Sequence, residues 1–65
     1  MLFYLDNKLK ITKHSKIKIE NNKKIEVNCD KNKFEIIGEN LVCKYYSKEE
    51  LLIQGNIERI YIYHE

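Results

Sequence analysis

Two histidines and two cysteines are the first candidates for bases, nucleophiles or metal ligands in this sequence. His14 falls in a predicted turn and His64 is the penultimate residue, so each is better explained as a solvated surface histidine. Cys29 and Cys43 lack both the CxxC spacing of a zinc site and the density of a disulfide scaffold. We interpret them as reduced thiols that pack in the core as small apolar side chains.

A pair of adjacent carboxylates, Glu49 and Glu50, could be considered for acid–base chemistry. Adjacent residues of a strand or turn point apart, so a solvated turn is the better interpretation. The sequence contains no GxGxxG, P-loop or DxD motif. Because catalysis needs a nucleophile, a base and a stabilising group brought together, we predict a protein that is not an enzyme and has no cofactor or metal.

The tyrosines are the remaining candidates for a binding surface. Aromatic rings among basic side chains can stack on single-stranded nucleic acid, but they can also fill a core or anchor a protein interface. Charged residues make up 34% of the chain, and their signs nearly cancel to a net charge of +2, which disfavours nucleic acid. The tyrosines concerned, each near a predicted strand end with basic residues nearby, are Tyr45, Tyr46, Tyr61 and Tyr63.

Short strands are the elements that must position these side chains. Divided into units of eight from residue 8, the sequence nearly repeats itself, and each unit holds two apolar residues spaced by two. A spacing of two is the period of a strand, and regularly spaced short strands are typical of an all-β domain. The apolar pairs are Leu9/Ile11, Ile17/Ile19, Ile25/Val27, Phe34/Ile36, Leu41/Cys43, Leu51/Ile53 and Ile60/Ile62.

Turn-forming residues separate the apolar pairs, and we predict structural turns at Asn21, Gly38 and Gly55. Asn tolerates the left-handed conformation that an odd-length loop needs, and Gly38 suits the first central position of a type II′ turn. In the resulting hairpins the apolar residues stay on one face, as a correct register requires. The predicted pairs are Ile17–Val27, Ile19–Ile25, Val27–Ile36, Cys29–Phe34, Ile36–Leu41 and Phe34–Cys43.

Residues 1–65 are therefore predicted to form one small all-β domain, an antiparallel meander of about seven short strands curled into a roll or small sandwich. The alternative is a short β-solenoid, since octet repeats could also stack as coils. Leu51, Leu52 and Ile53 are all apolar, which suggests a strand covered on both faces, and the phase of Ile57 and Ile60 suggests a β-bulge near 58–59.

The sequence shows no targeting signal. The run MLFYL is too short for the apolar region of a signal peptide and lacks a basic lead. No apolar run approaches the roughly 20 residues that a membrane-spanning helix needs. We expect a cytoplasmic protein without direct membrane insertion.

The first and last strands of an open sheet present unpaired backbone N–H and C=O groups that another strand can bind. The apolar segments LFYL and RIYIYHE carry few charges to discourage such pairing. We therefore predict sheet augmentation by a protein partner or by another copy of the chain. The predicted contact residues are Phe3, Tyr4, Arg59, Tyr61 and Tyr63.

The run IKIENNKKIEVNCDK, then Gly38, then KEELLIQGNIERIYI, resembles the YabP/YqfC sporulation proteins of endospore-forming bacteria. In that pattern an apolar-x-apolar-Glu-Asn unit and an Asp-Lys turn precede a Glu-Glu-apolar-apolar-apolar-x-Gly-x-Ile-Glu unit near the C-terminus. The resemblance covers residues 8–63; family members usually have a longer charged N-terminal lead and about one more strand before the final unit. The matching positions here are Ile17, Ile19, Glu20, Asn21, Asp30, Lys31 and 49–58.

This resemblance implies a non-enzymatic protein of the mother cell that serves assembly of the spore envelope, cortex or coat. It offers no catalytic residues, and it makes a membrane protein of the sporulation machinery a candidate partner, which would place the chain at the forespore surface. Two other functions stay open. One is a small nucleic-acid-binding β module that uses Tyr and Lys, and the other is a structural β-domain that self-associates as a homo-oligomer.

Overall fold

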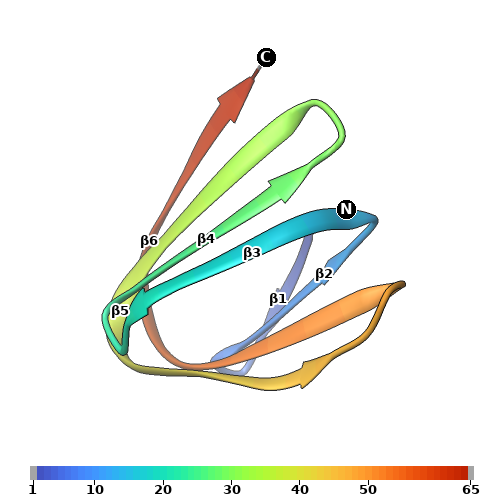
Figure 1. The fold of residues 1–65 in the computed structure, drawn as a ribbon. Helices are drawn as coiled ribbons and strands as arrows, with labels where there is room; N and C mark the ends of the chain where they lie inside the picture. The colour runs from blue at the N-terminus through green and yellow to red at the C-terminus, as the bar shows by residue number, and fades with distance from the viewer. Residues whose placement is uncertain (1, 65) are drawn as a thin grey trace.

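Six antiparallel strands build the computed structural model, which describes residues 2–64 (Figure 1). The strands follow one another in the sheet in the order β1-β2-β6-β5-β4-β3. The predicted all-β class is confirmed. The strands are β1 (Leu2–Leu5), β2 (Lys8–Thr12), β3 (His14–Asn21), β4 (Lys24–Cys29), β5 (Asn32–Tyr46) and β6 (Glu50–His64).

The predicted turns at Gly38 and Gly55 are wrong, because both glycines lie inside strands of 15 residues. β5 and β6 pair with each other along their whole length, so a turn at either glycine would break that ladder. A Cβ atom at Gly38 would collide with the carbonyl oxygen of Asn56, and one at Gly55 would lie 2.6 Å from the carbonyl oxygen of Asn40. The glycines therefore permit a close backbone approach, and the predicted pairs that required the Gly38 turn, Ile36–Leu41 and Phe34–Cys43, do not form.

Both long strands bend near their middle (Figure 1). The β5–β6 ladder shifts register at three places, and such bulges bend a strand. One of them leaves Glu58 as the extra residue between the Ile37–Arg59 and Gly38–Ile57 pairs, which confirms the predicted bulge near 58–59. Each long strand thus contributes one half to each of two leaves. The first leaf is β1, β2, residues 50–54 and residues 42–46; the second leaf is β3, β4, residues 32–39 and residues 56–64.

The hairpin β3–β4 has the predicted pairs Ile17–Val27 and Ile19–Ile25. In the next hairpin Val27 lies opposite Phe34, two residues away from its predicted partner Ile36, and Cys29 does not pair with Phe34. A shift of two residues keeps every side chain on its face, whereas a shift of one would invert them. The predicted faces therefore hold in this hairpin although its predicted register does not.

The core lies between the two leaves, where the inward positions of both meet in one cluster. The sheet is neither closed nor strongly curled, since β1 and β3 remain its edges, so the predicted roll is wrong. The solenoid alternative is also wrong, because all neighbouring strands are antiparallel. Among residues 2–64 the buried apolar side chains are Leu9, Ile11, Ile25, Val27, Phe34, Ile36, Leu41, Leu51 and Ile53.

Candidate functional site

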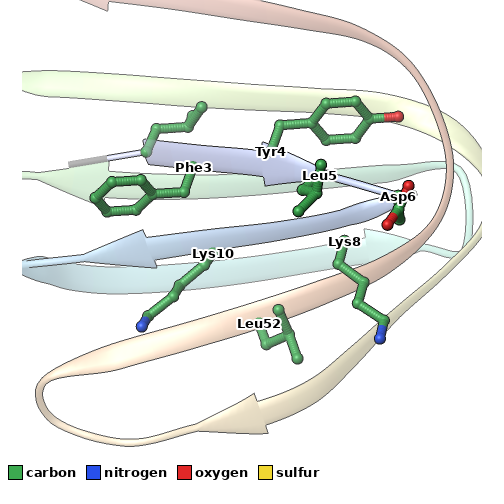
Figure 2. Close-up of a pocket in the computed structure, with 8 residues that line it drawn as sticks. Phe3, Tyr4, Leu5, Asp6, Lys8, Lys10 and Leu52 are labelled. Carbon is green, nitrogen blue, oxygen red and sulfur yellow. The ribbon is translucent and has the colours of Figure 1, made fainter.

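The predicted contact residues Phe3 and Tyr4 are neighbours on the edge strand β1 and point to opposite sides of it (Figure 2). Tyr4 lies opposite the buried Leu9, so its ring is on the core side, where it lines a small hollow with residues 57–60. Phe3 lies opposite Lys10 on the outer side and is 53% exposed. The two residues therefore belong to different surfaces.

The other three predicted contact residues share the outer face of the second leaf. The Arg59 guanidinium donates a hydrogen bond from Nη1 to the Tyr61 hydroxyl at 3.2 Å. The Lys33 ammonium lies 5.9 Å from the centre of the Tyr63 ring, within the range of a cation–π contact. The structure thus brings Arg59, Tyr61 and Tyr63 together and keeps them on a different face from Phe3.

Ion pairs cover the rest of this outer face. The Lys33 ammonium lies 2.7 Å from the Glu26 carboxylate, and the Lys24 ammonium lies 3.7 Å from that of Glu35. The hydrogen bond from Lys33 lowers the pKa of Glu26, and the same bond raises the pKa of Lys33. Acids and bases here neutralise each other, so this face has little net positive field to attract a phosphate backbone.

The outer face of the first leaf has a different character. We call it the apolar face and define it by five side chains that the strands carry outward: Phe3, Leu5, Val42, Tyr45 and Leu52. Across the leaf, Phe3 pairs with Lys10, Lys10 with Leu52, and Leu52 with Tyr45. Four of the five are more than half exposed, and Leu5 reaches 73%. The outward Lys8 and Lys10 of β2 separate Phe3 and Leu5 from the other three side chains. Groups of exposed apolar residues are candidates for interaction surfaces in soluble proteins.

Of this apolar face, the sequence predicted Phe3 as a contact residue and offered Tyr45 as a candidate for a binding surface. One signal was available, because Leu52 interrupts the alternation of Leu51 and Ile53, and this suggested a strand covered on both faces. The structure directs Leu51 and Ile53 into the core and Leu52 onto the apolar face. Leu5 and Val42 gave no such signal, since which side each faces depends on long-range pairing.

A hollow of about 710 Å³ runs along β1 on this side of the molecule (Figure 2). A second hollow of about 440 Å³ continues it across the leaf toward Tyr45, and a separate one of about 290 Å³ lies beside Val42. Lys10 and Leu52 line both the first and the second hollow, and Lys10 is held by an ion pair with Glu50 at 3.2 Å. The apolar face is therefore indented, with β1 as its border.

The two cysteines are free and half-buried, which places them at the margin of the core. Burial raises the pKa of both thiols. The Cys43 thiol also donates to the backbone oxygen of Tyr45 at 3.4 Å. A thiol whose pKa is raised carries little thiolate at neutral pH and is a weak nucleophile.

The prediction of a solvated His14 is wrong, because its side chain is only 8% exposed. The chain bends sharply at Lys13, which has a φ of 61°, and this bend places His14 opposite Cys29 and against the Tyr46 ring at 5.1 Å. Neither imidazole nitrogen has a hydrogen-bond partner among residues 2–64. His64 is exposed, with Nδ1 2.7 Å from the Asn32 amide oxygen.

Across residues 2–64, no group of three or more His, Cys, Asp or Glu side chains is arranged to hold a metal ion. The same residues include no helix with the length and apolar character to span a membrane.

Comparison with known proteins gives no relative for this chain. No family model matches it, and neither the curated proteins nor the solved structures contain a significant match. The resemblance to the YabP/YqfC proteins stays a prediction from the sequence pattern.

Proposed function

We propose that this protein is a non-enzymatic assembly module that binds other proteins through an open sheet edge. The observation that carries the proposal is β1, an edge strand whose four residues, Leu2–Leu5, include no charge, proline or bulge. Soluble proteins usually protect such an edge with charged side chains, and an unprotected edge is suited to pairing with another strand.

The opposite edge of the sheet provides the comparison. β3 carries Lys16, Lys18 and Glu20 along its length, and a bulge interrupts its ladder near Ser15. Charges and bulges both discourage the addition of a further strand. Among residues 2–64, the 42–46 half of β5 and the 56–64 half of β6 also pair on one side only, and they carry Lys44, Glu58 and Arg59. β1 is the uncharged edge, and it is therefore the one we assign to assembly.

The biological setting of the proposal comes from the YabP/YqfC resemblance. On that basis the module acts in the mother cell during spore envelope assembly, and its partner is a protein, with a membrane protein of the sporulation machinery as the first candidate. Such a partner would hold the cytoplasmic chain at the forespore surface. The resemblance supports this setting, and the β1 edge supports the mode of contact.

The experiment that tests the proposal follows tagged protein in its native host during starvation. A ring or cap at the forespore surface, absent from growing cells, is the expected result. The variant Phe3→Lys should lose this position, because it places a charge on the β1 edge. Ile19→Lys, on the opposite outer strand β3 and 55% exposed, is the matched control and should keep it. Diffuse signal throughout vegetative growth would contradict the sporulation role.

A second candidate function uses the cluster of Arg59, Tyr61, Tyr63 and Lys33, where two aromatic rings lie beside basic groups. Single-stranded nucleic acid could stack on such rings. Titration with a labelled oligonucleotide at two salt concentrations tests it. Salt-sensitive binding that Tyr61→Ala weakens at least tenfold would favour this function over the assembly role.

A further inference from the structure

The β1 edge has a specific complement in the chain itself. We propose that β1 binds antiparallel to β1 of a second copy, with Tyr4 directly opposite Tyr4 of the partner subunit. This inference rests on the proposed assembly function and names its partner as another copy of this chain. The backbone of β1 and its side-chain pattern lead to the same pairing.

The turn between β1 and β2 sets which backbone groups of β1 face its free side. Asp6 and Asn7 have φ values of 50° and 60°, the left-handed pair of a type I′ hairpin turn, and this turn closes on the Leu5–Lys8 pair. In an antiparallel strand, successive residues direct their backbone groups to alternate sides. If Leu5 bonds to β2, then Tyr4 directs its N–H and C=O away from β2, toward the free side.

The side chains of β1 set the register of the pairing with a second copy. Opposite residues of an antiparallel pair share a face, so pairing Tyr4 with its own copy keeps all inward and outward positions in order. It places Phe3 opposite Leu5 of the partner subunit on the outer side, and Leu5 opposite Phe3 of the partner subunit. The resulting interface is isologous, as the common two-fold dimers require, and it joins the apolar faces of both copies into one surface.

The hollow beside β1 adjoins the proposed contact. Its lining includes all four residues of β1 and Asp6. Lys8, Lys10 and Leu52 complete it from β2 and β6, so it covers the outer face of the first leaf next to β1 (Figure 2). Phe3 and Leu5 of the partner subunit would extend this outer face beyond the β1 edge.

Charge and area define the kind of partner. The row of Phe3, Tyr4 and Leu5 contains no charge, so two copies meet without repulsion. At roughly 200 Å² for a buried aromatic side chain, the exposed parts of these residues offer on the order of 300 Å² per subunit. A standard interface buries about 800 Å² per partner, so we expect a weak dimer that forms at high protein concentration.

Disulfide trapping tests the register in a Cys29→Ala/Cys43→Ala background. With oxidised glutathione, Tyr4→Cys should cross-link to itself, because opposite Cα atoms of an antiparallel pair lie about 4.5–5.5 Å apart, within disulfide range. Phe3→Cys alone should stay uncross-linked, whereas a mixture of Phe3→Cys and Leu5→Cys should give the mixed dimer. Equal cross-linking of all three samples would overturn the register.

Sedimentation equilibrium from about 10 µM to 1 mM tests the dimer itself. Wild type should shift from monomer to dimer, and Phe3→Lys should raise the dissociation constant at least tenfold. Ile19→Lys, on the opposite outer strand β3, should leave it within twofold. Far-UV circular dichroism and thermal unfolding confirm that each variant is folded. A wild type that stays monomeric at 1 mM overturns the self-pairing.

The two proposals fail in different ways. If wild type stays monomeric and gives no cross-link, but Phe3→Lys still loses its position in the host, the edge binds a foreign protein and self-pairing is wrong. If the dimer forms but Phe3→Lys keeps its position, self-pairing stands and the assembly function is wrong.

Discussion

At the residue scale, Gly38 and Gly55 lie where β5 and β6 approach too closely for a side chain. The position at Gly55 is doubly restricted, because its φ of 145° is also one that other residues rarely adopt. The neighbours of both glycines are backbone atoms of the paired strand, which cannot rotate away as a side chain could. These two residues thus decide whether the long strands can approach each other as closely as they do.

Replacing either glycine by alanine should destabilise the protein by at least about 2 kcal/mol, since the new methyl group forces the β5–β6 ladder apart. Urea unfolding followed by circular dichroism measures the change. Glu39→Ala, next to Gly38 but with an exposed side chain, is the matched control and should stay within about 0.5 kcal/mol. A Gly38→Ala variant as stable as this control would show that β5 and β6 can move apart here without a loss of stability.

His14 is the second residue of interest, because a buried imidazole without hydrogen-bond partners lowers stability. Its ring is held against Tyr46, and among the described residues neither nitrogen is satisfied. The variant His14→Leu should therefore raise the free energy of unfolding by about 1 kcal/mol, measured by urea unfolding. A loss of more than about 1 kcal/mol would instead mean that the nitrogens are satisfied by solvent in solution.

At the element scale, the two leaves are built alike. Each contains a hairpin, and the turn of each hairpin accepts a hydrogen bond from the glycine of a long strand: Gly38 donates to Lys23 at 3.0 Å and Gly55 donates to Asn7 at 3.1 Å. The leaves differ at their outer strands, since β3 has eight residues and β1 has four. The short, uncharged β1 is the element that leaves its side of the sheet open.

The link between the two hairpins is one residue, Lys13, in the left-handed conformation with a φ of 61°. This conformation costs a non-glycine residue about 1–2 kcal/mol. Glycine avoids that cost, but it loses more conformational entropy on folding, which offsets part of the gain. Lys13→Gly should therefore raise stability by about 0.5–1 kcal/mol, measured by urea unfolding. Lys13→Ala keeps the strain and should match wild type; a destabilised Lys13→Gly would mean that the lysine side chain stabilises the bend.

Cross-strand ion pairs connect β4 to β5, and the pair of Glu26 and Lys33 gives a pH dependence. The folded pKa of Glu26 is lowered, so its contribution to stability is present above the ordinary carboxyl pKa and is lost as pH falls through the lowered value. The melting temperature of wild type should therefore fall more steeply than that of Glu26→Gln between pH 5 and 2. Parallel curves for the two proteins would exclude this pair as a source of acid sensitivity.

At the scale of the whole molecule, one core between the leaves holds a chain of 65 residues. The radius of gyration of 10.4 Å is near the roughly 11 Å expected for a compact domain of this length. A domain of this size buries only about 60% of the surface of its unfolded chain, so each core side chain is a large share of the total stability. The exposed apolar face is therefore notable in a chain with so little apolar surface to spare.

Ile36 lies at the centre of this core and is fully buried. Ile36→Ala should cost about 2–5 kcal/mol, which is a large part of the stability of a small domain, and the unfolded fraction should become measurable without denaturant. Val42→Ala, on the apolar face, should change stability by less than about 1 kcal/mol. Similar losses at both positions would mean that Val42 is buried against other groups in solution.

Of the seven or so predicted strands, four are joined in pairs into the long strands β5 and β6. The sequence alone determined the all-β class, the side-chain faces of the β3–β4–β5 hairpins and the bulge near Glu58. These follow from the period of two and from local turn chemistry, both of which are properties of neighbouring residues. The pairs Ile17–Val27 and Ile19–Ile25 were predictable for that reason. The identity of the edge strand β1 was also predictable, because its uncharged sequence is unusual for a strand.

The tertiary structure alone decided what Gly38 and Gly55 do, where His14 lies and which surface each aromatic residue joins. A glycine is equally suited to a tight turn and to a close approach of two backbones. Only the pairing of β5 with β6 along their whole length selects the close approach. Likewise, Phe3 and Tyr61 have similar local sequences but lie on different leaves. Contacts between residues distant in sequence made these choices, because no local pattern encodes which strands become neighbours.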